Sequence, residues 1–401
     1  MTLPLLAGIV IVALTAGYLL YGRLIARQYG LDDARKTPAE EVNDGVDFVP
    51  TKPFYLMGQH FSAIAAAGPI VGPILACQQF GWLPCILWIG FGVILIGAVH
   101  DFSALIASVR HKAKSIAEIV RLNLGKRAWA GIMAFIWISL VYVIVAFTDV
   151  TAGTFMGTFE GLGDVKVDFN RGGAVAFAAT SYLALAMVMG LIQKRFNPPL
   201  WIMTLIFVPA TLAVVWLGTH CSHLLALGGP HAGKTWGAII LAYCFVASLL
   251  PVWLLLQPRG YLGGFVLYMV FAVGIIGIFS GKFGIEQPAF KGWIQLDKSG
   301  QPTPTGLLFP FLFVTIACGA CSGFHGLVCS GTTSKQISKE SDCRPVGYGA
   351  MLMEGFVALI ALATIMMVAK PAGKPGDTYG FGIGQFLTVL IGEKNLPGAI
   401  V

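Results

Sequence analysis

The sequence carries little charge. Lys, Arg, Asp and Glu make up 11% of its 401 residues, whereas soluble globular domains carry about 25%. Hydrophobic residues make up 56%, and the mean hydropathy is +0.78. So few charged side chains cannot coat a soluble protein of 42.7 kDa. The composition therefore excludes a soluble enzyme, a nucleic-acid binder and a disordered chain, although the net charge is +7.

The sequence also lacks the short motifs of common catalytic and nucleotide sites. No P-loop, dinucleotide fingerprint, zinc-protease motif or nucleophile elbow occurs, which argues against direct ATP-driven transport. Cys318 and Cys321 form a C-x-x-C pair in an apolar stretch, where buried cysteine is the simpler interpretation. One loop contains three histidines, namely His220, His223 and His231. Only Cys221 could complete a metal site there, so we expect no metal and no cofactor other than a coupling ion.

Long apolar segments are what the sequence has in abundance. Each is long enough for a helix to cross a bilayer, which takes about 20 residues. The ten segments are 3–22, 56–80, 82–108, 128–156, 172–192, 198–218, 236–257, 261–281, 307–331 and 348–369. A further one, 380–392, is too short to span alone. The first segment has neither a basic start nor a cleavage site, so we expect a retained helix. The pattern predicts an all-α polytopic membrane protein with one transmembrane domain over 1–401.

The basic residues fix an orientation. When the connecting loops are assigned alternately to the two sides, one side holds 17 of the 26 Lys and Arg and the other holds nine. The loops of the first side are 23–55, 109–127, 193–197, 258–260 and 332–347. Short cytoplasmic loops are rich in Lys and Arg, so these loops are expected to be cytoplasmic and the N-terminus to lie outside.

Three acids lie inside apolar segments without a Lys or Arg to pair with them: Asp101, Asp149 and Glu354. Intramembrane acids are candidates for ion coupling. The alternative is a carboxylate at a helix end that reaches interfacial water. We expect Asp149 to be the coupling or amine-facing acid, and His100, beside Asp101, to belong to a proton relay or to anchor its helix end.

Segment 56–80 contains Gly68-Pro69 and Gly72-Pro73 near its middle. Proline removes a backbone donor and glycine weakens a helix, so we expect the helix to unwind there. Freed backbone groups would bind substrate at Ala67, Gly68, Pro69 and Gly72. The alternative is tight packing of small residues. At the start of the segment, Gln59 and His60 are expected to act in gating.

Segment 236–257 is also interrupted by proline, at Pro251. Gln257 and Arg259 follow it and are expected to act in gating. This segment lies five helices after 56–80 and in the opposite orientation, which is typical of inverted-repeat transporters. We therefore expect 3–22 to be an extra helix, 56–218 the first repeat and 236–401 the second.

The second half of segment 307–331 and the residues after it are rich in small and hydroxyl side chains. We expect Ser322 and His325 to bind substrate, and Ser330, Thr332 and Thr333 to bind the coupling ion. Hydroxyl oxygens suit sodium, whereas histidine suits a proton or a carboxylate. The alternative is hydrogen bonding between helices.

Several strings resemble the carbon starvation protein A family. They are HFSAIAAAGPIVGPILA, FGWLPCILWI, GAVHDFSALIASVRH, AFTDVTAGTF, LPVWLLLQPRGYL, CSGFHGLVCSGTTSKQI and YGAMLMEG. The resemblance implies a bacterial inner-membrane transporter that takes up peptides or pyruvate when carbon is scarce. It also implies membership of the amino acid–polyamine–organocation superfamily, with the LeuT-type fold of two inverted five-helix repeats.

Two differences from the family stand out. Family members often have Asp where this chain has Gly260, and they continue past Val401 through another helix. We therefore expect the second repeat to lack its last helix.

These observations predict a secondary importer in the bacterial cytoplasmic membrane, coupled to protons or sodium, for peptides or pyruvate. Its partners would be the small-molecule substrate and the lipid bilayer, with no nucleic acid, and the oligomeric state stays open. The alternatives are a channel or passive pore, a membrane-embedded enzyme or metalloprotein, and a nutrient sensor derived from a transporter.

Overall fold

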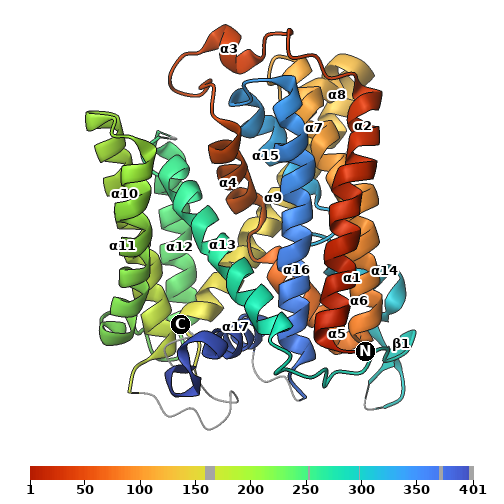
Figure 1. Ribbon diagram of the computed structural model, residues 1–401, viewed down its shortest axis with the longest axis vertical. Helices are drawn as coiled ribbons and strands as arrows, with labels where there is room; N and C mark the ends of the chain where they lie inside the picture. Colours follow the sequence, from red (N-terminus) through yellow and green to blue (C-terminus); the bar gives the residue numbers. More distant parts are fainter. Residues whose placement is uncertain (159–167, 252, 298, 370–373, 397–401) are drawn as a thin grey trace. The chain divides into compact units, whose positions relative to one another are not determined.

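The computed structural model describes residues 1–158, 168–251, 253–297, 299–369 and 374–396 (Figure 1). The chain forms two compact units. Unit 1 contains Met1–Met133 and Phe271–Pro371, and unit 2 contains Ala134–Val270 and Ala372–Val401.

Within the described ranges, eight helical spans are long and apolar enough to cross a membrane. A ninth arises if the bent pair α4 (Pro53–Ile64) and α5 (Gly68–Phe80) counts as one span. The structure is therefore mostly helical and polytopic, as the sequence predicts. Nine of the ten predicted segments are matched, and 307–331 is the exception.

Unit 1 contains three continuous spans. They are Leu3–Tyr29, which joins α1 (Leu3–Ala16) to α2 (Gly22–Tyr29), Trp82–Arg110, which joins α6 (Trp82–Gly92) to α7 (Ala98–Arg110), and Glu340–Met366, which contains α16 (Ala350–Met366). Its remaining described elements are short: α3 (Pro38–Val42), α8 (Ile116–Leu124), the antiparallel strands β1 (Ile294–Leu296) and β2 (Pro302–Leu307), α14 (Leu308–Thr315) and α15 (Gly323–Gly331).

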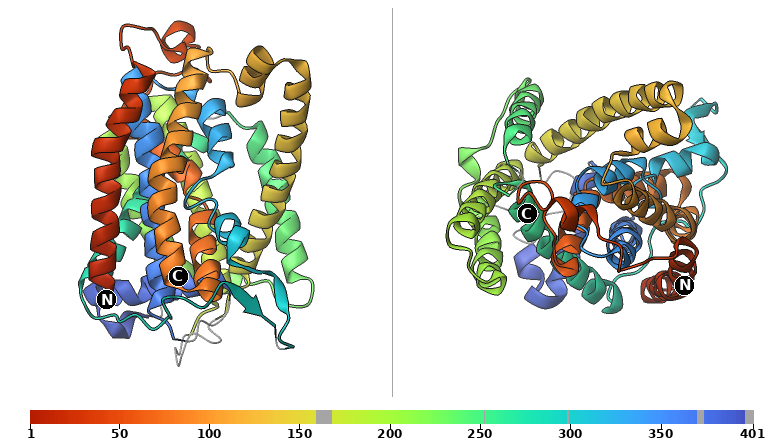
Figure 2. Two further views of the ribbon diagram at one scale, coloured as in Figure 1. Left: turned by 90° about the vertical axis from the view of Figure 1, so that its right-hand side faces the viewer. Right: turned by 90° about the horizontal axis from the view of Figure 1, so that it is seen from above.

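The helix α16 is the core of unit 1. It packs against α1, α4, α5, α6 and α7, and the view from above in Figure 2 places it among them. Of its 17 residues, all except Met353 and Phe356 are buried. A helix that is apolar all round lies in a protein core or in a membrane, and α16 is surrounded by other helices. Glu354 is the one charged residue of α16, so this burial carries a carboxyl group into the core.

The bend between α4 and α5 is 44°, and it confirms the predicted interruption of segment 56–80. Non-helical backbone at Ala65 makes the break, just before Gly68. Pro69 then lies in the first turn of α5, where its missing N–H has no helical partner to lose. Pro73 lies inside α5, so the carbonyl of Pro69 loses its usual helical donor.

A second break interrupts the predicted segment 307–331, which is not one continuous helix. The helix α14 ends at Thr315 and α15 begins at Gly323, with non-helical backbone at Ile316 and Ser322. A Cβ atom on Gly68 would collide with the Cys318 side chain, and one on Gly72 would collide with the Thr315 carbonyl oxygen. Glycine is therefore required on α5 because the two breaks pack directly against each other.

The prediction that Pro251 interrupts a membrane span was wrong. The helix α12 ends at Leu249 with Leu250 in an extended conformation, and α13 begins only at Leu256. The residue before a proline is disfavoured in a helix, so the chain leaves the helix before Pro251. The second interrupted segment of the chain is therefore 308–331, and the expected pairing of 56–80 with 236–257 loses its basis.

Unit 2 consists of long helices. They are most of α9 (Lys126–Phe155), α10 (Arg171–Phe196), α11 (Leu200–His220), α12 (Ala232–Leu249), the first part of α13 (Leu256–Phe279), and α17 (Pro375–Ile391). An ion pair between buried Arg171 of α10 and Asp377 of α17 joins the two ends of this unit's sequence. The helix α17 is not among the candidate spans, in agreement with its predicted shortness.

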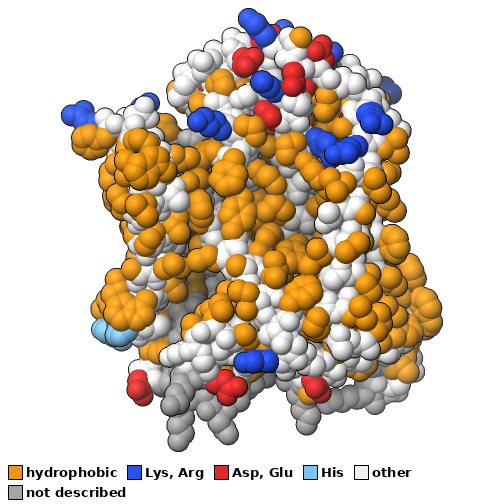
Figure 3. All heavy atoms as spheres, viewed as in Figure 1, with side chains coloured by type: hydrophobic (Ala, Val, Ile, Leu, Met, Phe, Trp, Pro, Cys, Tyr) orange, Lys and Arg blue, Asp and Glu red, His pale blue; other side chains and the backbone are white. Residues whose placement is uncertain are grey.

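Three loops predicted to be cytoplasmic meet at one end of unit 1, where α3 and α8 lie in Figure 1. Buried Glu340 accepts hydrogen bonds from Arg35 at 2.7 Å and from Arg110 at 2.9 Å, so one carboxylate links all three loops. Nearby, the Ser341 N–H and hydroxyl hydrogen-bond to Asp33 and hold the pKa of that carboxyl below its ordinary value. In Figure 3, charged side chains gather at this end, and hydrophobic side chains cover α1.

Candidate functional site

Three buried ionisable side chains from three helices meet in the core of unit 1. They are Asp101 of α7, His325 of α15 and Glu354 of α16. His325 Nδ1 lies 2.8 Å from Asp101 Oδ2, and His325 Nε2 lies 3.1 Å from Glu354 Oε2. The imidazole ring therefore separates two carboxyl groups. We call these three residues the acid–histidine cluster.

Glu354 is the least satisfied member of the cluster. Its Oε2 atom is within ion-pair distance of His325, but the geometry is out of line for a hydrogen bond. Among the described residues, neither of its carboxyl oxygens has a hydrogen-bond partner. A buried carboxyl group in this situation needs a neighbouring positive charge or a bound proton.

Two further side chains extend the cluster. His100 Nδ1 lies 2.8 Å from Asp101 Oδ1, and the His100 side chain is 37% exposed. Cys318, at the second break, places its Sγ atom 3.8 Å from His325 Nε2. The cluster is therefore closed toward the core but has two neighbours at its partly exposed side.

The arrangement makes the charge of the cluster depend on bound protons. A protonated imidazole donates from both nitrogens, and a neutral one donates from only one. With a neutral ring, one carboxyl group faces a nitrogen lone pair unless that carboxyl takes the proton itself. The three groups therefore titrate as a unit, and each proton changes the charge of a dry site by one.

The spacing of some of these atoms could also suit a metal ion. Ligand atoms of Cys318, His325 and Glu354 lie within 4.8 Å of one another. Three donors converge among the described residues, whereas structural zinc sites use four protein ligands and catalytic ones use three.

The two helix breaks lie beside the cluster. Cys318 belongs to the second break and packs on Gly68, which opens α5. Gly68 is half-buried, and Gly323, which opens α15, is exposed. Ser322 precedes α15 without a side-chain cap, but its carbonyl accepts from the His325 N–H at 3.3 Å. This leaves the Gly323 and Phe324 N–H groups without a partner among the described residues. The structure thus joins Gly68 to His325 through Cys318 and packs Pro69 on Gly319 of the same break, whereas Gly72 contacts Thr315.

The hydroxyl groups predicted to bind a coupling ion do not converge on one point. Ser330 Oγ accepts a hydrogen bond from the Ile116 N–H at 3.3 Å, and Thr333 Oγ1 lies 2.8 Å from His60 Nδ1. Thr332 is half-buried at the end of α15. The Ser330 and Thr333 hydroxyl groups contact other segments of unit 1, in line with the alternative that they make hydrogen bonds between helices.

The remaining predicted site residues are divided between the two units. Asp149 lies on α9 of unit 2 and is exposed. Gln257 is half-buried and Arg259 exposed, both on the unit 2 part of α13. In unit 1, Ala67 is half-buried beside the first break, whereas Gln59 is buried, with its side-chain oxygen unpartnered among the described residues.

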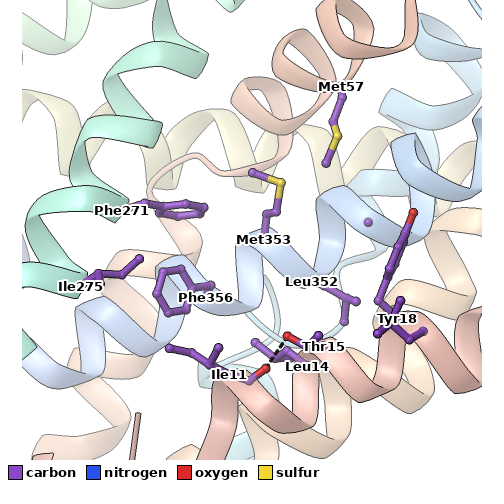
Figure 4. Close-up of a pocket in the computed structure, with 12 residues that line it drawn as sticks. Ile11, Leu14, Thr15, Tyr18, Met57, Phe271, Ile275, Leu352, Met353 and Phe356 are labelled. Carbon is purple, nitrogen blue, oxygen red and sulfur yellow. Dashed lines mark hydrogen bonds between the residues drawn. The ribbon is translucent and has the colours of Figure 1, made fainter. Parts of the chain in front are cut away.

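Two apolar pockets in unit 1 do not have the chemistry of a carboxylate site. One, of about 400 Å³, is lined by α1, α4, α13 and α16 (Figure 4). In it, Met57 and Met353 approach each other, and Phe271 faces Phe356. Its one aliphatic hydroxyl, on Thr15, already donates to the Ile11 carbonyl. The other, of about 460 Å³, is lined by aromatic and aliphatic side chains, including Trp88 and Trp293. Neither pocket presents a charged group.

The sequence predicts members of the site but not its assembly. Asp101 and Glu354 stand out in it as acids without a Lys or Arg partner, and His325 is expected separately as a substrate ligand. The partner of both acids is His325 itself. The available signal was that the apolar segments contain three histidines, His60, His100 and His325, any of which could pair with an acid that has no Lys or Arg partner. The role of Glu340 in joining three loops had no signal, because Glu340 lies in a charged loop like many others.

Comparisons with known proteins agree with the resemblance inferred from the sequence. The family model described as carbon starvation protein CstA matches residues 3–373. A protein named peptide transporter CstA from Helicobacter pylori is 42% identical over 86% of this chain and 48% of its own length. The Bacillus subtilis protein of the same name is 38% identical over 96% of this chain and 61% of its own length.

A third relative, named pyruvate/proton symporter BtsT, from Escherichia coli, is 37% identical over 95% of this chain and 51% of its own length. These relatives are transporters, not enzymes. The chain spans about half the length of most of the curated relatives it matches. No solved structure matches it. The match over nearly the whole chain shows that it belongs to the carbon starvation protein CstA family.

Proposed function

We propose that this protein is a proton-coupled importer of small carboxylates, either pyruvate or short peptides, in the bacterial cytoplasmic membrane. The observation that carries the proposal is the acid–histidine cluster, buried in a transmembrane unit beside two helix breaks. Buried ionisable groups of this kind are costly and mark ion pathways. The names of the relatives, a peptide transporter and a pyruvate/proton symporter, support both the substrate class and the ion.

The chemistry of the cluster favours a proton over sodium. Sodium is a hard cation and prefers several oxygen ligands at close quarters, as other hard cations do. The cluster offers an imidazole and a thiol beside its carboxyl groups, and the hydroxyl groups of Ser330 and Thr333 are used elsewhere. Protons are therefore the coupling ion that these residues suit best.

Electrostatics supply the coupling. With His325 charged and both acids ionised, the cluster carries one net negative charge, and one added proton brings it to zero. A substrate carboxylate beside the cluster is repelled in the first state and tolerated in the second, and low polarity strengthens this difference. Substrate and proton therefore favour each other's binding, which is what coupled import requires.

The breaks supply the substrate contacts. At the starts of α5 and α15, the N–H groups of Gly68, Gly323 and Phe324 have no hydrogen-bond partner among the described residues and attract a carboxylate. Nothing lies within 4 Å of a Cβ position on Gly323, so a carboxylate can approach the backbone closely there. We propose Ala67, Gly68, Pro69 and Gly72 on one side and Ser322 on the other as the substrate site. Gating by Gln59, Gln257 and Arg259, and coupling by Asp149, stay predictions.

We also propose that the chain contains an inverted repeat whose register differs from the predicted LeuT-type pairing, because six candidate spans separate its two broken helices where two five-helix repeats would place four. The first broken helix is α4–α5 and its counterpart is α14–α15, which runs antiparallel to it: His60 meets Thr333, whereas Gly72 meets Thr315. Each broken helix is followed by a long span, α6–α7 and α16. In this register the second repeat begins at residue 308, later than the predicted residue 236.

The test is uptake by reconstituted protein. Labelled pyruvate, alanine and a dipeptide are offered to vesicles under a proton gradient or a sodium gradient alone. We expect accumulation of pyruvate or the dipeptide under the proton gradient and none under the sodium gradient. Accumulation driven by sodium, or equilibration without accumulation, would contradict the proposal.

A further inference from the structure

His60 is a buried histidine that the acid–histidine cluster does not include. It lies on α4, before the first break, and its side chain is buried. Its Nδ1 atom lies 2.8 Å from Thr333 Oγ1, and its Nε2 atom lies 3.9 Å from Cys329 Sγ. Both ring nitrogens therefore meet polar atoms of the chain that follows the second break.

On one side, His60 is close to the cluster. Cys329 Sγ, which contacts His60, also lies 3.5 Å from the Asp101 backbone oxygen. Asp101 and His325 are near enough for their charges to act on the His60 ring. These two residues, from α7 and α15, together with Cys329, are the titratable groups that face it.

On the other side of His60, the residues after Thr333 approach the end of unit 1 where the basic loops lie. Thr333 is followed by Ser334, whose hydroxyl lies 2.9 Å from Ser108 Oγ, and Ser108 in turn reaches the Lys114 carbonyl at 2.8 Å. Thr333, Ser334 and Ser108 are buried, and Lys114 lies in the loop after α7. Thr333 thus contacts His60, and the next residue, Ser334, begins a row of buried hydroxyl groups that reaches a loop predicted to be cytoplasmic.

The side-chain oxygen of Gln59, next to His60, is buried and has no hydrogen-bond partner within the described residues. Buried acceptors in folded proteins are normally paired, often with water. Next to His60 in the sequence there is thus a buried acceptor that a water molecule can use. A polar route of this kind through an apolar unit is expensive unless it has a function.

We propose that His60 passes the proton from the acid–histidine cluster to the cytoplasm. Water carries the proton across the gap between the Asp101 carboxyl group and His60 Nε2. The ring accepts a proton at Nε2 and releases the proton from Nδ1 to Thr333 Oγ1, whose own hydroxyl proton moves on to water. The ring ends with the charge it began with, and one proton has moved toward the cytoplasm.

This inference rests on the proposed proton-coupled transport and adds the path by which the proton reaches the cytoplasm. It predicts a separation of two activities. Net uptake requires the proton to leave on the inside, so it requires His60. Counterflow, the exchange of inside for outside substrate at equal pH, returns the carrier with its proton still bound and does not require His60.

The experiment compares His60→Gln with the wild type and with His223→Gln, which changes an exposed histidine in a loop of unit 2. Glutamine keeps a hydrogen-bonding side chain but cannot take up a proton. In vesicles, His60→Gln is expected to lower proton-driven accumulation of labelled pyruvate or dialanine at least about tenfold. Counterflow is expected to stay above about half of the wild-type rate, and His223→Gln to match the wild type in both assays.

Thr333 provides a second pair of variants. Thr333→Val removes the hydroxyl and is expected to lower driven uptake while sparing counterflow, and Thr333→Ser is expected to restore it. This pair carries the test if His60→Gln does not fold.

The outcomes are distinguishable. If both activities fall together in His60→Gln and Thr333→Val, the residues act in folding or binding and the proton route is wrong. If neither activity falls, it is wrong as well. If the wild type accumulates no substrate under a proton gradient, the proposed function fails first, and this inference fails with it.

Discussion

The helices α16 and α9 are both long and apolar, and each carries one acid in a predicted span, yet almost all residues of one are buried and almost none of the other are. All but two of the 17 residues of α16 are buried, whereas only Ala152 and Gly153 of the 30 in α9 are. Glu354 of α16 lies against His325, and Asp149 of α9 is exposed.

The two helices differ in what surrounds their apolar side chains. In a membrane, lipid and protein interior are equally apolar, so hydropathy identifies both helices without separating them. An acid distinguishes them, because it is stable in the core only with a partner. The predictions below test whether partnered, buried groups of unit 1 determine function and stability more than their exposed counterparts.

The largest effect is expected from Glu354→Gln. The amide has the shape of the acid but cannot bind or release the proton, so proton-driven uptake should fall by about 10²-fold. Counterflow of labelled substrate should persist, because the substrate contacts remain. Unchanged driven uptake would remove Glu354 from the coupling mechanism.

Glu340→Gln should have the largest effect on stability. The buried carboxylate faces Arg35 and Arg110, and loss of a buried ion-pair partner costs about 3 kcal/mol. The matched control is Asp47→Asn, since Asp47 pairs with Lys335 at 3.2 Å while 48% exposed, and such a pair is worth at most about 1 kcal/mol. Thermal unfolding in detergent measures both. Equal shifts in the two variants would speak against the role of burial.

Gly72→Ala should destabilise the contact between the two breaks. The added methyl group meets the Thr315 carbonyl, and overpacking of this kind costs about 1–3 kcal/mol. Gly131→Ala in α9 is the control, because nothing lies within 4 Å of a Cβ there, and alanine should stabilise that helix by about 0.5–1 kcal/mol. A rise in the unfolding temperature of Gly72→Ala would show that the breaks do not pack closely.

The smallest effect is expected from Asp149→Asn. The side chain is exposed, and surface changes of this kind are usually worth less than about 0.5 kcal/mol, so uptake should change less than about twofold. A large loss of proton-driven uptake would restore Asp149 as the coupling acid that the sequence suggests.

Much of the architecture could be predicted because hydropathy and proline act locally. The nine spans, the interruption near Gly68 and the short last helix follow from residues adjacent in sequence. The break at 316–322 could not be predicted, since no proline lies within it and the sequence ACGACS can continue a helix. That backbone is opened by its contact with α5, which is a tertiary effect.

The site was predicted as separate residues and not as a cluster. Charge scarcity identified Asp101 and Glu354, and composition identified His325, but their meeting depends on three helices that are distant in sequence. The Pro251 prediction was wrong for the converse reason: proline ends a helix as readily as it breaks one, and only the neighbouring structure decides which.

The central claim is that the acid–histidine cluster moves a proton with each substrate, and proton movement can be measured directly. Vesicles that contain the reconstituted protein and a pH-sensitive dye receive pyruvate or dialanine at equal pH on both sides. We expect the lumen to acidify with substrate entry in the wild type, and the acidification to disappear in Glu354→Gln. Substrate entry without acidification in the wild type, or acidification that survives in Glu354→Gln, would contradict the account.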